Sequence, residues 1–142
     1  MALRISQVEV WAAALEDRPG AAAEKLDALA EAGANLEFIV ARRTPKKGGG
    51  VLYVTPVLGK DVRKAAESAG FAVAEGLHSV RVDGRDEVGV GARMTGALAE
   101  AGINMRGISA AAIGDQAVWY LAFDSEEDAG RAVQMLRGLD AS

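Results

Sequence analysis

Residues 17–41 read DRPGAAAEKLDALAEAGANLEFIVA, and residues 86–110 read DEVGVGARMTGALAEAGINMRGISA. The two stretches align without a gap at a constant offset of 69, and 12 of the 25 aligned pairs are identical. Both place an Asp-x-x-Gly sequence before an alanine-rich segment and a Gly-x-Asn sequence after it, which similar composition alone does not explain. A fixed offset indicates repeated structural units. We therefore interpret the chain as two copies of one unit, at residues 1–75 and 76–142.

The same order of elements is predicted in each copy from hydrophobic periodicity and turn residues. In the first copy Asp17 is a candidate helix cap, Pro19 suits a first helical turn, and Gly33 ends the helix. The predicted elements of this copy are strands at 8–12, 36–41, 51–57 and 71–73 and helices at 19–32 and 61–69. Those of the second copy are strands at 77–82, 103–110 and 116–123 and helices at 88–101 and 125–136.

The order β-α-β-β-α-β is typical of a ferredoxin-like α+β unit, in which two helices cover one face of an antiparallel four-stranded sheet. The second copy ends soon after Gly138, which aligns with Gly70, so its last strand is missing, very short or supplied by another segment. The strands at 36–41 and 117–123 are apolar on both faces, whereas a sheet covered on one side alternates apolar with polar residues. We expect the other repeat or another chain to cover the second face.

The composition of the 142-residue chain argues against several function classes. Its net charge is −4, which disfavours a nucleic-acid-binding protein. No apolar run approaches the ~18 residues of a membrane span, and the start of the chain lacks a secretion signal, so we expect a cytoplasmic protein with no membrane contact. The absence of Cys and the single histidine, His78, argue against thiolate and multi-histidine metal sites. We expect no metal and no cofactor.

The order of strand, Asp17-Arg18-Pro19-Gly20, amphipathic helix, Gly33-x-Asn35 and strand resembles the ACT domain family. The resemblance covers residues 8–73 and 77–138, so the chain is similar to tandem ACT-domain proteins of bacteria. In the second copy Glu87 and Val88 replace Arg18 and Pro19. The family binds amino acids or similar small metabolites where two units meet, at the first strand-to-helix turn and the start of the second strand.

The residues at the first turn have chemistry that suits a free amino acid. The start of a helix offers unpaired amides and a positive dipole end to a carboxylate, and Gly20 and Ala21 leave that backbone open. Asp17 can accept from an ammonium group, and Asn35 can both donate and accept. Together with the resemblance, this gives the candidate ligand-binding residues Asp17, Arg18, Pro19, Gly20, Ala21, Asn35, Leu36, Asp86, Gly89 and Asn104.

Each of these residues also has a structural interpretation. Asp17 could cap the helix, Asn35 could be a left-handed turn residue after Gly33, and Gly20 could permit close packing of helix and strand. Among other features, residues 44–50 are interpreted as a mobile hairpin loop rather than a phosphate loop. His78 is expected to pack in the structure, and Trp11, Trp119 and Tyr120 are expected in the core or at an interface. Glu126, Glu127 and Asp128 are expected at a solvated helix start.

These observations favour a non-catalytic regulatory protein, which binds an amino acid at an interface of ACT units and transmits its level to a partner. We expect a homodimer and a regulated enzyme or regulator protein as partner. One alternative is an ACT-type dimerisation or interaction module without a ligand. A more remote alternative is a small ferredoxin-like enzyme, although no nucleophile–base pair is visible in the sequence.

Overall fold

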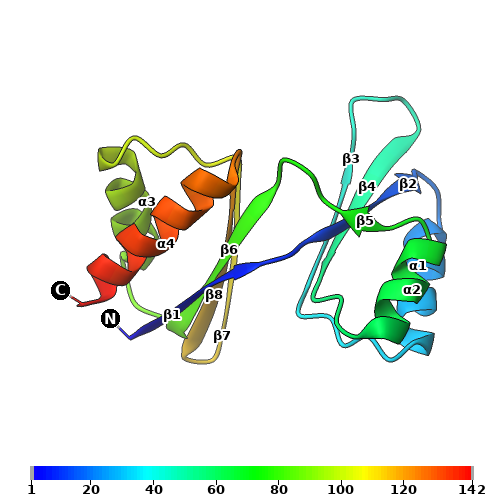
Figure 1. The fold of residues 1–142 in the computed structure, drawn as a ribbon, viewed down its shortest axis with the longest axis horizontal. Coiled ribbons are helices and arrows are strands. Elements are labelled where there is room, and N and C mark those ends of the chain that lie inside the picture. The colour runs from blue at the N-terminus through cyan, green and yellow to red at the C-terminus, as the bar shows by residue number, and fades with distance from the viewer. Residues whose placement is uncertain (1, 142) are drawn as a thin grey trace. The chain divides into compact units, whose positions relative to one another are not determined.

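The computed structural model describes residues 2–141, which form two compact units, each an antiparallel sheet with two helices (Figure 1). We call Glu9–Ala74 the first unit. The second unit combines the segment that ends at Val8 with the segment that begins at Glu75. The predicted α+β class with two ferredoxin-like units is confirmed.

The first unit follows the predicted order of elements. Its sheet has the strand order β3-β4-β2-β5, and all three strand pairs are antiparallel. The side chains that form its core lie between this sheet and its two helices, and they include the fully buried Leu29, Leu52 and Val54. Its elements are β2 (Trp11–Glu16), α1 (Ala21–Glu31), β3 (Phe38–Arg43), β4 (Gly49–Thr55), α2 (Lys60–Ser68) and β5 (Ala72–Val73).

The second unit repeats this architecture with the strand order β1-β6-β8-β7. Its core contains Met94 and Leu98 from one helix, Leu136 from the other, and Val82 and Phe123 from the sheet. Its elements are β1 (Leu3–Val8), β6 (His78–Arg85), α3 (Val90–Glu100), β7 (Gly107–Ile113), β8 (Gln116–Phe123) and α4 (Glu126–Ala141).

The fourth strand of the second unit comes from the beginning of the chain. β1 pairs antiparallel with β6, in a register that runs from Leu3 opposite Gly84 to Val8 opposite Ser79. Arg4 Nε donates to Asp83 Oδ1 at 2.6 Å, so a side-chain hydrogen bond also joins β1 to β6. β1 thus holds the position beside β6 that β5 holds beside β2. The predicted limits 1–75 and 76–142 therefore differ from the compact units in the assignment of the segment that ends at Val8 and of Glu75.

Several predicted element limits are wrong for identifiable reasons. The predicted strand at 8–12 is interrupted, because β1 ends at Val8 in one sheet and β2 begins at Trp11 in the other. The predicted strand at 103–110 begins too early: Ile103 is apolar because it packs in the core, but the strand begins only at Gly107. The last helix continues through Gly138 to Ala141 instead of ending at Leu136.

Other sequence interpretations are confirmed. Trp11 and Tyr120 are buried, and Trp119 is partly buried against the core of the second unit. The segment around residues 44–48 connects β3 to β4, and the Gly49 amide donates to the Lys46 carbonyl at 3.0 Å within this turn. The acidic residues from Glu126 to Asp128 occupy the first turn of α4, where Ser125 Oγ accepts from the Asp128 amide at 3.0 Å.

Candidate functional site in the first unit

The turn between β2 and α1 is built around a glycine with a left-handed backbone. β2 ends at Glu16, α1 begins at Ala21, and Gly20 at the helix N-cap has φ +87°. Side chains rarely adopt this conformation, so the position favours glycine. The Asp17 amide donates to the Gly48 carbonyl at 3.1 Å, which joins the turn to the β3–β4 connection. The first amides of α1 have no partners within the helix, and the first three residues of the helix are alanines.

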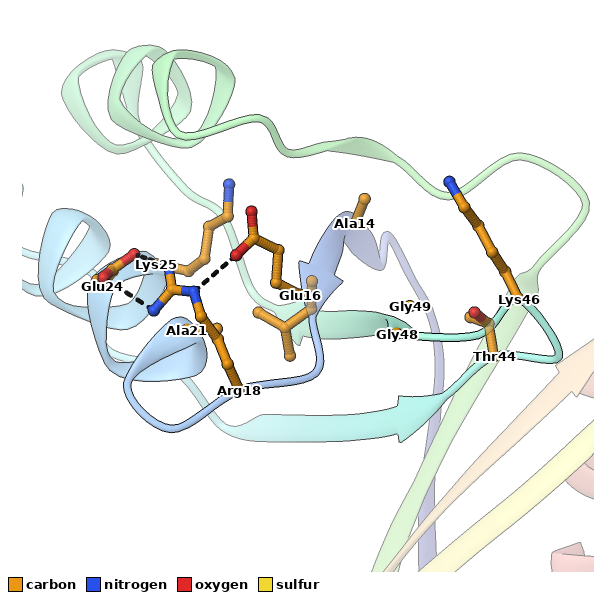
Figure 2. A pocket seen from close by; sticks show the side chains of 12 residues that line it. Ala14, Glu16, Arg18, Ala21, Glu24, Lys25, Thr44, Lys46, Gly48 and Gly49 are labelled. Atoms are coloured by element: carbon orange, nitrogen blue, oxygen red, sulfur yellow. Dashed lines mark hydrogen bonds and ion pairs between the residues drawn. The ribbon is translucent and has the colours of Figure 1, made fainter.

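Two adjoining cavities open at this turn, and they share Leu15, Glu16, Arg18 and Gly50 as lining residues. The larger, of about 620 Å³, lies between the start of α1 and the β3–β4 connection, as Figure 2 shows. Its other lining residues are Ala14, Ala21, Glu24, Lys25, Thr44, Lys46, Gly48 and Gly49. The smaller, of about 300 Å³, lies between α1 and the end of β3, and its other lining residues are Asp17, Gly20, Ala22, Ala23, Ala41, Arg42 and Arg43.

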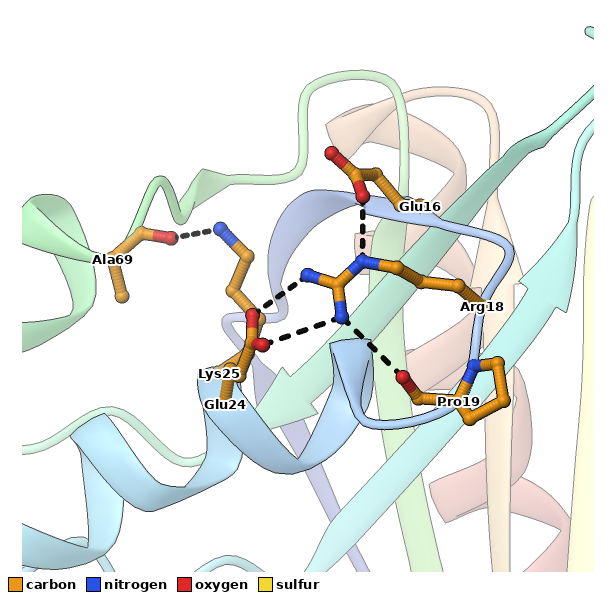
Figure 3. Close-up of polar contacts among 6 residues, drawn as sticks. All are labelled: Glu16, Arg18, Pro19, Glu24, Lys25 and Ala69. Carbon is orange, nitrogen blue, oxygen red and sulfur yellow. Dashed lines mark hydrogen bonds and ion pairs between the residues drawn. The ribbon is translucent and has the colours of Figure 1, made fainter.

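Arg18, which lines both cavities, links two carboxylates (Figure 3). Its Nε donates to Glu16 Oε2 at 2.6 Å, and its Nη2 donates to Glu24 Oε2 at 2.9 Å. Hydrogen bonds to Glu24 and Glu16 raise the pKa of the Arg18 guanidinium. In turn, the Arg18 hydrogen bond and charge hold the pKa of Glu24 below its ordinary value, so Glu24 is ionised at neutral pH.

The structure brings part of the predicted ligand-binding set together. Asp17, Arg18, Gly20 and Ala21 all line one or both cavities. Asp17 is not a helix cap, so its structural interpretation is wrong: the helix N-cap has no side-chain hydrogen bond, and Asp17 Oδ2 accepts from Arg43 Nε at 2.9 Å instead. Pro19 precedes α1 rather than lying in its first turn, and its carbonyl accepts from Arg18.

Asn35 and Leu36 lie at the other end of α1. A helix of 11 residues spans about 16 Å, which separates Asn35 from Asp17 within the unit. The left-handed role suggested for Asn35 is wrong, because within residues 2–141 only glycines have positive φ; Gly33, at φ +92°, is one of them. Asn35 is exposed, and Leu36 packs partly buried against the core.

The second unit keeps the backbone of the turn, but an aromatic ring lies beside the start of its helix. Gly89 at the N-cap of α3 has φ +86°, and the Asp86 amide donates to the Asp115 carbonyl at 2.8 Å. Asn104 is exposed between α3 and β7. The Trp119 ring lies against the start of α3, where a Cβ added to Gly91 would be 2.5 Å from Trp119 Cη2. Neither of the cavities described above includes Asp86, Gly89 or Asn104.

Sequence reasoning missed the cationic residues around the cavities, which are Lys25, Arg42, Arg43 and Lys46. The signal was the run of basic residues from Arg42 to Lys47, which was interpreted only as a strand end and turn. In the part of the chain that the structure describes, no group of three or more His, Cys, Asp or Glu side chains could hold a metal ion. None of the helices described is long and apolar enough to cross a membrane.

The comparisons with known proteins agree with this architecture. The profile of the ACT domain matches residues 14–69 and again residues 78–137. No curated protein matches the sequence. Among solved structures, a protein from Bacteroides thetaiotaomicron has a TM-score of 0.78 and 15% identity over 94% of this chain and 90% of its own.

Two other similar structures carry a description of their role. The ligand-free regulatory subunit of aspartate kinase from Thermus thermophilus has a TM-score of 0.65 and 20% identity, over 97% of this chain and 96% of its own. The corresponding subunit from Thermus flavus has a TM-score of 0.58 and 21% identity, over 96% and 97%. These identities are low, and the likeness concerns the fold. The two profile matches cover most of the sequence, and the chain belongs to the ACT domain family, with two ACT domains in tandem.

Proposed function

We propose that this chain is a non-catalytic regulatory protein of the cytoplasm that binds an amino acid or a similar small metabolite at the β2–α1 turn of its first unit. The observation that carries the proposal is the pair of cavities at this turn, which meet the start of α1 and are lined by Asp17, Arg18 and Gly20. Membership of the ACT family supports a regulatory role that depends on a small molecule. The likeness to regulatory subunits of aspartate kinase supports a regulated enzyme as partner.

The chemistry of the turn suits both charged ends of an amino acid. The ligand carboxylate would accept from the amides of Ala22 and Ala23, which line the smaller cavity beside the positive end of the helix dipole. The ligand ammonium would donate to the Asp17 carboxylate, which the exposed Arg43 side chain holds at the same cavity. Two or three charge-assisted hydrogen bonds, less the entropy of association, correspond to dissociation constants in the range of roughly tens of micromolar.

Asn35 and Leu36 would contact a ligand only at the turn of a different ACT unit. Because α1 separates them from Asp17, a ligand at the turn would meet an Asn35 or Asn104 contributed by a different ACT unit. We propose that such a unit belongs to a second copy of the chain. The proposal therefore includes assembly, which completes the site and lets ligand binding change an interface that a partner recognises.

A calorimetric titration tests the ligand proposal. A thermal-shift screen with the twenty amino acids first identifies the ligand, which would raise the melting temperature. We expect Asp17→Ala to weaken its binding about tenfold, because the ammonium loses a charged acceptor. The matched control is Asp27→Ala, which removes an exposed carboxylate of α1 outside both cavities. No binding by any amino acid, or equal affinities in the two variants, would refute the site.

The homodimer that we propose would form along β7. This strand is at an edge of its sheet, its sequence GISAAAI carries no charge, and Ile108 and Ile113 are 46% and 85% exposed. An exposed edge without charges is a template for pairing with another strand, whereas Arg42 and Arg43 protect the edge strand β3. Sedimentation should show a dimer that Ala111→Lys converts to monomer, while Lys47→Ala does not. A monomeric parent protein would refute this part.

A further inference from the structure

The charged side chains around the two cavities of the first unit are not balanced. They comprise three carboxylates, Glu16, Asp17 and Glu24, and five cationic groups, Arg18, Lys25, Arg42, Arg43 and Lys46. This local excess of positive charge occurs in a chain whose net charge is −4. We propose that the first unit selects a ligand with net negative charge, of the class of dicarboxylic amino acids, and that the second unit does not bind it. The inference rests on the function proposed above and names the ligand class of the same site.

Each of the three carboxylates is paired with an arginine. Arg18 holds Glu16 and Glu24 at 2.6 and 2.9 Å, and Arg43 holds Asp17 at 2.9 Å. Two of these carboxylates share one guanidinium (Figure 3), so the two arginines and three carboxylates together keep a net charge of 2 − 3 = −1. The other three cations of the lining bring the net charge of these eight side chains to 5 − 3 = +2.

Among residues 2–141, the remaining three cations form no ion pair with a carboxylate, although the pKa of Glu24 is lowered chiefly by the Arg18 hydrogen bond and also by the charge of Lys25. Lys25 Nζ donates to the carbonyl of Ala69, and Arg42 Nη1 donates to the carbonyl of Ala41. Lys46 lies on the β3–β4 connection, across the larger cavity from Lys25 (Figure 2). A hydrogen bond to a neutral carbonyl group does not cancel the positive charge of the lysine or arginine that donates it. A cleft lined by one sign of charge concentrates ligands of the opposite sign.

These charges distinguish between amino acids of similar size. A dicarboxylic amino acid brings a second carboxylate, which forms charge-assisted hydrogen bonds with Arg42 or Lys46. Its amide counterpart has the same shape without the charge. A basic amino acid would add a further cation to a cavity that already has an excess of them, and like charges oppose binding.

The second unit differs from the first in the charges of the equivalent strand and in the space beside the helix start; its cavity of about 430 Å³ lies between the ends of β1 and β6 and does not include the start of α3. At the constant offset of 69, Ala111 and Ala112 occupy the positions of Arg42 and Arg43. The Trp119 ring lies against Gly91, whose equivalent in the first unit is Ala22, a lining residue of the smaller cavity. The start of α3 is therefore closed on the side where the start of α1 is open, and we expect one ligand per chain.

Calorimetry on the full chain with L-glutamate, L-glutamine and L-lysine tests the ligand class. We expect L-glutamate to bind at least about tenfold more tightly than L-glutamine, with one site per chain. Arg42→Ala should reduce the affinity for L-glutamate about tenfold and leave that for L-glutamine within about twofold. Lys47→Ala is the matched control, since Lys47 is the neighbouring cation outside both linings, and it should change neither affinity. L-Aspartate and L-asparagine provide a second pair of the same design.

The possible failures separate this inference from the proposed function. If L-glutamine, L-lysine or another neutral or basic amino acid binds at least as tightly as the acidic ones, the ligand class is wrong and the proposed function stands. If none of the twenty amino acids binds, both are wrong. If two ligands bind per chain and Trp119→Leu does not change that number, the assignment to the first unit alone is wrong.

Discussion

The two ACT units share the backbone of the β–α turn but differ in almost every charged side chain around it. Gly20 and Gly89 both have left-handed backbones at the helix N-cap, with φ values of +87° and +86°. At the same offset, Glu16, Arg18 and Glu24 of the first unit are replaced by Arg85, Glu87 and Arg93, so each of the three charges is reversed. Recurrence of a motif in both copies thus reflects the backbone geometry that the fold requires. The binding chemistry has to be judged separately for each unit.

The difference extends to the packing beneath the helix. The strand registers place Leu52 opposite Ala13 and Trp119 opposite Val82, which makes Leu52 and Trp119 equivalent positions. Leu52 is fully buried in the core of the first unit, and a cavity remains beside Ala22. The larger Trp119 reaches the start of α3 in the second unit and is accommodated by Gly91. The first unit thus has a cavity beside the start of its helix, and the second unit has an aromatic ring at the equivalent place.

The largest effect that we expect from disturbing this packing comes from Gly91→Ala. A Cβ at this position would lie 2.5 Å from Trp119 Cη2, so the ring or the helix must shift. Overpacking of this kind costs about 1–3 kcal/mol in the free energy of unfolding, which urea denaturation measures.

Gly96→Ala is the matched control for this substitution. Gly96 lies on the same helix, and a Cβ there would have no atom within 4 Å. Removing an exposed helical glycine should stabilise the protein by up to about 1 kcal/mol. If the two variants have the same free energy of unfolding, Trp119 does not close the start of α3 in the way described.

The fold was largely predictable because its signals are local. The Asp-x-x-Gly and Gly-x-Asn sequences mark where α1 and α3 begin and end, and the repeat at offset 69 extends each assignment to both copies. The origin of the fourth strand of the second unit was not predictable in this way. Leu3–Val8 pairs with a strand about 75 residues away, and the break between β1 and β2 falls within the continuous, mostly apolar stretch of residues 8–12.

The site was predictable only where backbone geometry determines it. Gly20 and Ala21 follow from the helix start, and both line a cavity. The role of Asp17 depends on Arg43, 26 residues further along the chain, which no local pattern reveals. Asn35 belongs to the motif, but it lies at the opposite end of α1 from the turn. A sequence pattern does not show which unit would complete the site.

The smallest expected effect concerns the Arg18–Glu24 pair, whose charges are reversed in the second unit. Because Arg18 lowers the pKa of Glu24 in the folded protein, this pair adds stability at neutral pH that is lost as the pH falls through the folded pKa of Glu24. An NMR titration of Arg18→Ala should show the Glu24 pKa raised towards its ordinary value. Arg43→Ala removes a neighbouring arginine that pairs with Asp17, and it should leave the Glu24 pKa unchanged. An unchanged Glu24 pKa in Arg18→Ala would mean that the pair does not persist in solution. Glu24 would then be free to contribute a negative charge to the cavity, which would weaken the preference for acidic ligands.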